Sequence, residues 1–247
     1  MPEPRLTVDL DPPRSALAVG AHPDDIEFGC GGTLAKWSSA GTEVHLLVLT
    51  DGSKGTWDPQ ADLHKLVRRR QREQEAAADV LGARSVHFAD FVDGELEVTP
   101  RERAAVCKVI RRVRPEVLLG HDPWKRYRLH PDHRRAGELV VEGLVAARDP
   151  HFFPELDLEP HRPDRLLLFE PDAPDHFEDI ATTVATKVLA LLCHRSQWRS
   201  TMGIDADAPD ADAQRDAFAQ AVRDTARDAG SAVGLACAEE FKRIEPL

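Results

Sequence analysis

Short apolar runs that alternate with amphipathic segments constrain the fold of this chain more than any other feature. The apolar runs predict buried strands, and the segments between them predict helices. The strands are expected at 16–21, 44–50, 85–88, 116–120 and 165–169, and the helices at 29–40, 61–81, 100–113, 131–147 and 180–193. This alternation predicts an α/β fold in which a mostly parallel sheet carries helices on both faces. Ligands of such sheets bind beyond the carboxyl ends of the strands.

The sequence contains no internal repeat or long linker, so we expect a single domain over 1–247. Two stretches do not follow the alternation. Residues 149–164 form an irregular excursion that contains Pro and His. Residues 203–230 are rich in Ala, Asp and Arg, and we expect them to form an acidic insertion or a solvated surface helix.

Composition disfavours several classes of protein. The net charge of −11 disfavours broad contact with nucleic-acid phosphates. No apolar run approaches the roughly 18 residues that span a bilayer, so no membrane partner is expected. Met1–Arg5 lacks the apolar core of a signal peptide. The four cysteines are far apart and form no CxxC pair, which favours reduced thiols in a cytoplasmic protein.

Two polar clusters directly follow predicted strands. His22-Pro-Asp24-Asp25 follows the first strand, and His130-Pro-Asp132-His133 comes shortly after the fourth. Both should meet at the same edge of the sheet, where two imidazoles and a carboxylate could hold a zinc or iron(II) ion. Three protein ligands leave a coordination position open, which is typical of a catalytic site.

Simpler interpretations exist for each motif. The first cluster could be a turn in which Asp24 or Asp25 caps a helix, and an isolated HxxH also occurs by chance. The glycine-rich run at 29–32 could cradle a phosphate, but it matches no nucleotide fingerprint, and close packing of helix on strand explains it better.

The motifs, taken in order, resemble the LmbE/PIG-L family of zinc-dependent N-acetylglucosaminyl deacetylases. The resemblance rests on Ala21–Glu27, Gly29–Leu34, Thr50–Gly52, Arg70 with Glu73, and His130–His133. It implies a Rossmann-like three-layer sandwich that binds one Zn²⁺. The position two residues before His130 is Arg128, where the mycothiol branch of the family carries a tyrosine.

The resemblance also implies roles for individual residues. The zinc ligands would be His22, Asp25 and His133. Asp24 would be the general base, His130 would stabilise the oxyanion or protonate the leaving amine, and Asp132 would orient His130. Candidates for contact with substrate are Arg70, Asp93 and His194. Asp132 is also expected to raise the pKa of the His130 imidazole.

The main hypothesis is therefore a zinc hydrolase that deacetylates an N-acetylated amino sugar or a related N-acyl small molecule. The alternative is a non-catalytic sugar- or nucleotide-binding module on a Rossmann-like sheet. A serine hydrolase is disfavoured because the chain has no GxSxG motif. Because the family often forms higher assemblies, a homo-oligomer is possible.

Overall fold

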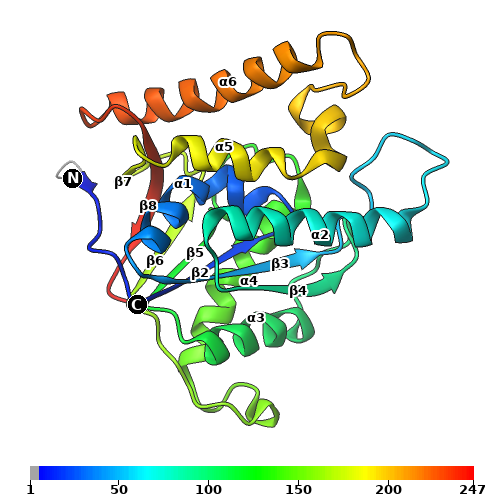
Figure 1. The fold of residues 1–247 in the computed structure, drawn as a ribbon. Helices are drawn as coiled ribbons and strands as arrows, with labels where there is room; N and C mark the ends of the chain where they lie inside the picture. The colour runs from blue at the N-terminus through cyan, green and yellow to red at the C-terminus, as the bar shows by residue number, and fades with distance from the viewer. Residues whose placement is uncertain (1–5) are drawn as a thin grey trace.

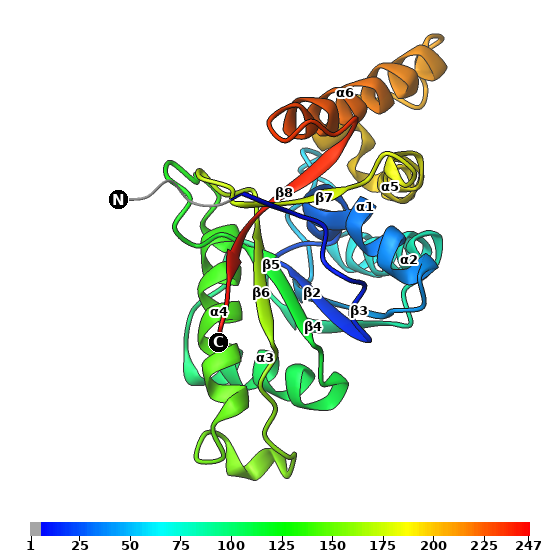
Figure 2. The ribbon, with the colours of Figure 1, turned by 90° about the vertical axis from the view of Figure 1, so that its left-hand side faces the viewer.

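The computed structural model describes residues 6–247 and shows one eight-stranded sheet flanked by helices (Figures 1 and 2). The expectation for Met1–Arg5 lies outside the described residues. The strands are β1 (Thr7–Val8), β2 (Ser15–Gly20), β3 (Glu43–Thr50), β4 (Ser85–Phe91), β5 (Val117–His121), β6 (Arg165–Phe169), β7 (His176–Asp179) and β8 (Ala238–Ile244). The α-helices are α1 (Asp25–Ser39), α2 (Leu63–Leu81), α3 (Pro100–Val113), α4 (Pro131–Arg148), α5 (Val184–Leu192) and α6 (Ala211–Ser231). Within residues 6–247, no helix is both long and apolar enough to cross a membrane.

The strand order is β1-β7-β8-β6-β5-β2-β3-β4, and β8 alone runs antiparallel to its neighbours. The predicted α/β class with a mostly parallel sheet is therefore confirmed. The sequence did not indicate β1, β7 or β8. The first two are short, and β8 mixes charged with apolar residues, so none presents the apolar run of a buried central strand.

Two layers of helices enclose the sheet. Successive residues of β2 face opposite sides, so Ala16 and Ala18 join one core cluster while Leu17 and Val19 join the other. Helices α1, α2 and α5 cover one face, and α3 and α4 cover the other (Figure 1). This is the expected three-layer arrangement.

Helix boundaries follow local capping chemistry. Asp62 accepts a hydrogen bond from the amide of Lys65 at the start of α2, and Gly82 ends that helix at φ 71°. Helix α1 begins at Asp25, four residues before its expected start, and Cys30 interrupts its helical geometry. The early start places Asp25 in the first turn of a helix at the edge of the sheet.

The two stretches that do not follow the alternation, 149–164 and 203–230, also have defined structures. Residues 211–231 form the surface helix α6, which buries only Ala219, Ala226 and Gly230. The excursion at 149–164 is held by Arg111, whose buried guanidinium donates to backbone carbonyls at the end of α4 and to those of Asp149 and Phe152.

The glycine-rich run allows α1 to pack closely on its neighbours. A Cβ atom on Gly29 would lie 2.5 Å from the Phe169 ring, and one on Gly32 would lie 2.9 Å from Ile180. Gly31 has ordinary space, with its nearest neighbour, Lys187 Cγ, 3.5 Å from such an atom. The interpretation of this run as a packing feature is therefore confirmed.

We expect Gly29→Ala to lower the free energy of unfolding by about 1–3 kcal/mol, because an added methyl group must displace a buried ring. Gly31→Ala is the matched control. It should be neutral or stabilising by up to about 1 kcal/mol, because alanine favours a helix and meets no obstacle. Urea unfolding of both variants measures the difference, and equal stabilities would contradict this account.

Candidate metal centre

The turn after β2 presents two neighbouring carboxylates in different ways. The Asp25 carboxylate accepts a hydrogen bond from the His22 amide at 2.7 Å and points back toward the His22 ring. Asp24 has φ 107°, an uncommon backbone conformation for a residue with a side chain, and its carboxylate makes no capping hydrogen bond. The helix-cap explanation of this motif therefore does not account for Asp24.

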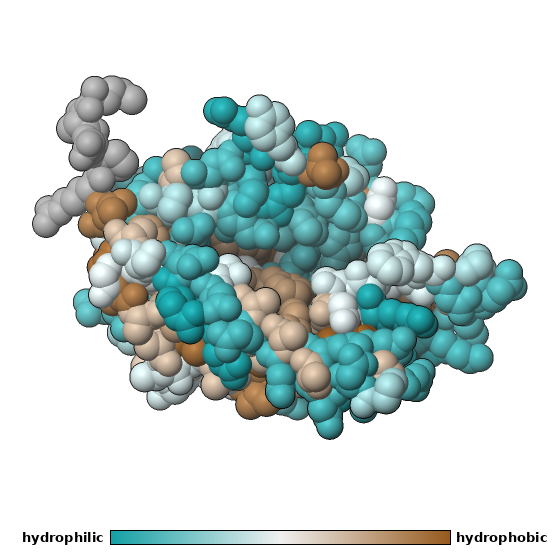
Figure 3. Space-filling model, turned by 90° about the horizontal axis from the view of Figure 1, so that it is seen from above, coloured by the Kyte–Doolittle hydropathy of each residue, from teal (hydrophilic) through white to brown (hydrophobic). Residues whose placement is uncertain are grey.

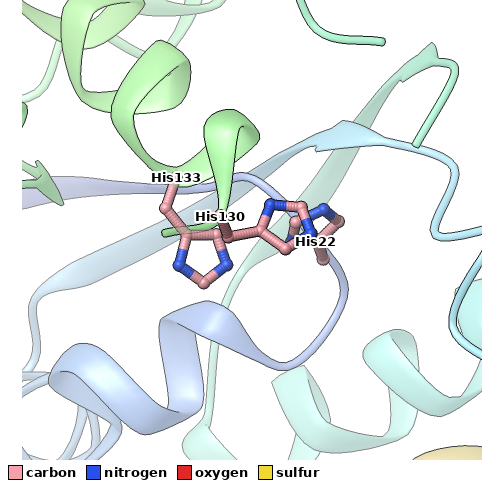
Figure 4. Close-up of side chains that lie close together, drawn as sticks. All are labelled: His22, His130 and His133. Atoms are coloured by element: carbon pink, nitrogen blue, oxygen red, sulfur yellow. The ribbon is translucent and has the colours of Figure 1, made fainter. Parts of the chain in front are cut away.

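The second motif begins α4. His130 is the residue before the first turn, and its Nδ1 accepts a hydrogen bond from the Asp132 amide at 3.3 Å. Pro131 occupies the first helical position, where its missing amide hydrogen costs nothing. His133 lies one turn further on, so both imidazoles point toward the turn after β2. Figure 4 shows His130 and His133 extending from the start of α4 toward His22.

The three predicted ligands lie next to one another around Asp25. Its Oδ2 is 3.3 Å from His22 Nδ1, its Oδ1 is 3.3 Å from His133 Nε2, and the rings of His22 and His133 have centroids 5.2 Å apart. Potential ligand atoms fall into three overlapping groups, namely His22 with His130 and His133, Asp25 with His121 and His133, and His22 with Asp93 and Asp132. These groups share members, so one compact centre contains them all.

Three residues of this centre were not predicted as members. His121 ends β5, and its Nε2 lies 3.2 Å from Asp25 Oδ2 while its ring stacks on His133. Glu170 follows β6, and its Oε2 lies 3.3 Å from His121 Nδ1 and 2.7 Å from Arg128 Nη1. The rule that singled out His22, a polar residue directly after a buried strand, also applies to His121 and Glu170. No comparable rule identifies Arg128, which donates to His133 Nδ1 at 2.9 Å.

Two further carboxylates flank His22 on its other side. His22 Nε2 lies 3.1 Å from Asp93 and 3.2 Å from Asp132. Burial acts to lower the pKa of His22, but hydrogen bonds to Asp132, Asp25 and Asp93 raise it well above its usual value. If a metal occupied Nδ1, a proton on Nε2 would bridge to these carboxylates, an arrangement common around metal-binding histidines.

The structure corrects the expectation for the pKa of His130. Burial and the neighbouring imidazoles of His22 and His133 lower this pKa, and Asp132 only partly opposes them. The carboxylate of Asp132 instead binds His22 and accepts from the amides of Gly94 and Leu96. Asp132 contacts His130 through its backbone amide, which favours the neutral ring with its proton on Nε2. His130 is exposed at the mouth of the centre.

Asp24 lies beside two polar side chains of α2, Gln74 and Arg70. Its amide donates to Gln74 Oε1 at 3.1 Å, and its carboxylate lies 3.6 Å from Arg70 Nη2. Burial raises the pKa of Asp24 to about 6, although the positive charge of Arg70 opposes this effect. Arg70 also donates to the carbonyls of Gly52 and Pro23, and its side chain is 3% exposed.

The predicted substrate contacts are all buried in this structure. Asp93 binds His22 and accepts from the Lys54 amide. His194 is fully buried, and its Nε2 lies 3.4 Å from Glu27, which also accepts from Gln74. Burial acts to lower the pKa of His194, but the neighbouring Glu27 carboxylate raises it above its usual value. Asp93, His194 and Arg70 are buried and contact other protein groups, which favours a role in holding the residues of the centre in place. Their contact with substrate stays a prediction.

The donor chemistry fits a divalent metal ion. Asp25, Asp93 and Asp132 are buried together with His22, and an unpaired buried carboxylate is unfavourable by several kcal/mol. Mixed imidazole and carboxylate donors are typical of zinc and iron(II) sites. The centre could therefore hold a metal through His22, Asp25 and His133, with His121 and His130 at its margins.

The chain is similar in sequence and fold to several known proteins. The family model described as GlcNAc-PI de-N-acetylase (PIG-L) matches residues 17–144. A diacetylchitobiose deacetylase of Thermococcus kodakarensis is 38% identical over 188 residues, which are 75% of this chain and 70% of that protein. A 4-oxalmesaconate hydratase of Pseudomonas putida is 30% identical over 200 residues, 75% of each chain. The solved N,N'-diacetylchitobiose deacetylase of Pyrococcus horikoshii has a TM-score of 0.83 at 30% identity, covering 96% of this chain and 87% of that one.

We expect the purified protein to bind about one divalent ion per chain, and His22→Ala or His133→Ala to weaken binding by at least about 100-fold. His64→Ala, at an exposed position on α2, is the control and should bind normally. Elemental analysis and competition with a chromogenic chelator measure the affinity. Unchanged binding in both site variants would exclude these ligands.

Proposed function

The chain belongs to the PIG-L family, and from this premise we propose that it is a metal-dependent hydrolase that deacetylates an N-acetylated amino sugar or a related N-acyl small molecule. One observation carries the proposal. The Asp24 carboxylate, which has no capping role, and the exposed imidazole of His130 flank the same cluster of His22, Asp25 and His133.

We infer that the resident metal is Zn²⁺, held by His22, Asp25 and His133. When bound, zinc would act as a Lewis acid toward the amide carbonyl and lower the pKa of water. The two-imidazole, one-carboxylate set supports this choice, because it matches the ligand preferences of zinc and leaves room for water and substrate.

Asp24 would act as the general base. Its pKa of about 6 suits a group that must be ionised near neutral pH and still hold a proton. The carboxylate would take a proton from the attacking water and later supply a proton to the nitrogen that leaves. Arg70 and Gln74 hold Asp24 in position, which limits the reorganisation needed during reaction.

His130 would stabilise the tetrahedral oxyanion. The Asp132 amide occupies Nδ1, so Nε2 carries the proton of the neutral ring and is free to donate. One hydrogen bond of this kind contributes about 3–4 kcal/mol to stabilisation of a transition state. A neutral His130 acts here by donating a hydrogen bond, not by carrying a charge at rest.

The location and assembly of the protein belong to the proposal as well. All four cysteines are free in the structure, which supports a cytoplasmic location. The exposed Trp124, Tyr127 and Leu129 beside the centre support a homo-oligomer or contact with a ligand.

The first test is Asp24→Asn. We expect this variant to keep about one metal ion per chain and to lose about 10²–10⁴-fold in kcat, because it retains the shape but not the base. Release of free amine from N-acetylglucosamine derivatives, together with metal analysis, measures both properties.

Full activity of Asp24→Asn would exclude Asp24 as the base. The same samples should be assayed for hydration of 4-oxalmesaconate, since one relative is a 4-oxalmesaconate hydratase. Hydration without amine release would replace the deacetylase proposal. Stoichiometric sugar binding that survives chelation, without turnover, would favour the non-catalytic module.

The pH dependence provides a second test. Asp24 must be ionised to act, so kcat/KM should fall as the pH decreases through about 6. Removing the positive charge in Arg70→Gln should raise the pKa of Asp24 and shift this acid limb to higher pH. Arg68→Gln, at an exposed position two residues away, should leave the limb in place. Identical profiles for both variants would contradict the assignment.

A further inference from the structure

His121 is a buried imidazole to which the proposed reaction gives no role. Hydrophilic side chains cover much of the surface, as the view from above shows (Figure 3), but His121 at the end of β5 is 1% exposed. Its ring stacks on that of His133, and Phe169 meets it edge to face, with centroids 4.6 Å away in both cases. A ring packed against two others cannot turn freely, so its two nitrogens keep fixed directions.

Each nitrogen of this ring faces a carboxylate. Nε2 lies 3.2 Å from Asp25 Oδ2, and Nδ1 lies 3.3 Å from Glu170 Oε2. An ionised carboxylate only accepts hydrogen bonds, so the ring is the donor toward both oxygens. His121 therefore connects a candidate metal ligand to a carboxylate that follows the neighbouring strand, β6.

The contact with His121 bears on how the Asp25 carboxylate is oriented. The last torsion of an aspartate side chain has a broad energy well, so hydrogen bonds decide where its two oxygens point. Oδ2 accepts from the His22 amide at 2.7 Å and faces His121 Nε2. Oδ1 faces His133 Nε2 at 3.3 Å. Donors from two different strand ends thus hold one oxygen, and the other is directed toward His133.

The backbone of Glu170 adopts an uncommon conformation beside this ring. Its φ of 58° lies in the left-handed region, which residues with a side chain rarely occupy. Strain of this kind persists only where the surroundings enforce it, and it is concentrated at functional sites. Arg128 Nη1 lies 2.7 Å from Glu170 Oε2 and holds the carboxylate from the loop before α4. Glu170 is therefore fixed in place next to His121.

Direct binding of the metal by His121 is the main alternative. Its ligand atom lies within 4.8 Å of those of Asp25 and His133. Together with His22, however, it would make a set of four protein ligands, which closes the position that water and substrate need. A hydrogen bond to Asp25 leaves that position open and uses the direction in which Nε2 already points.

We propose that His121 and Glu170 are positioning residues of the metal centre. His121 holds the Asp25 carboxylate in the orientation that binds the metal, and Glu170 holds the His121 ring in its place. This inference rests on the proposed metal-dependent function and adds two residues that act through Asp25.

Metal affinity is the direct test, measured on the purified protein by competition for Zn²⁺ with a chromogenic chelator. We expect His121→Leu to keep about one ion per chain but to bind it about 10–100-fold more weakly, because Asp25 loses a hydrogen bond that orients it. His121→Gln should recover most of this affinity, since its amide nitrogen can replace Nε2 as the donor to Asp25. A residue that only filled space would be replaced as well by leucine as by glutamine.

Glu170→Ala tests the second positioning residue and should weaken Zn²⁺ binding by about tenfold. Glu75→Ala, at an exposed position on α2, is the matched control and should bind normally. The visible absorption of the Co²⁺-loaded protein separates positioning from direct binding. His121→Leu should keep the wild-type bands, because the set of metal ligands is unchanged. Thermal melting of the metal-depleted variants checks that each one is folded.

The proposal is overturned if His121→Leu binds Zn²⁺ as tightly as the wild type, or if His121→Gln loses as much affinity as His121→Leu. It is also overturned if the Co²⁺ bands of His121→Leu shift, because His121 is then a ligand. Should His121→Leu fail to fold, unchanged affinity of Glu170→Ala would overturn the proposal by itself.

The outcome for the proposed function can be told apart from these results. If the wild type binds one metal ion but releases no amine from any N-acetylated sugar, the deacetylase function fails. The order of metal affinities among the variants still supports or overturns the positioning roles in that case. A wild type that binds no divalent ion would overturn both proposals.

Discussion

The burial of the Asp25 carboxylate among imidazoles is the interaction on which the site depends. Its two oxygens lie within 3.3 Å of nitrogens from His22, His121 and His133, and Oδ2 also accepts the His22 amide. A buried carboxylate without such partners would be strongly unfavourable. Burial acts to raise the pKa of Asp25, but the neighbouring His133 and His121 side chains outweigh it and hold this pKa well below its usual value. A bound metal ion would likewise favour the ionised form of Asp25.

The close packing of α1 keeps that carboxylate in place. Gly29 and Gly32 let α1 approach Phe169 and Ile180 more closely than any side chain would permit. On its other side, Gln74 joins α2 to the α1 turn by bonding both the Asp24 amide and Glu27. Asp24 and the candidate ligands are therefore held by packed elements, which suits a site that must keep its geometry.

Polar side chains also line the sheet edge beyond the centre. Strands β2, β5, β6 and β8 bring His22, His121, Glu170 and Glu240 successively along one edge. The strand order therefore determines which side chains can act on one molecule. The antiparallel β8 matters here, because its reversed direction places its first residues beside the carboxyl end of β6.

The sequence by itself determined the α/β class, the central strands and the two motifs, because apolar periodicity and capping are local properties. Local spacing also brought Asp25 back to His22. Only the tertiary structure placed His121, Glu170 and Arg128 at the centre, because strand order and loop paths join residues far apart in the chain. It also turned the Asp132 carboxylate to His22 and away from His130, since the first turn of α4 directs it toward the amides of Gly94 and Leu96. Which polar groups share a buried volume, and so which pKa values shift, depends on packing that no local pattern contains.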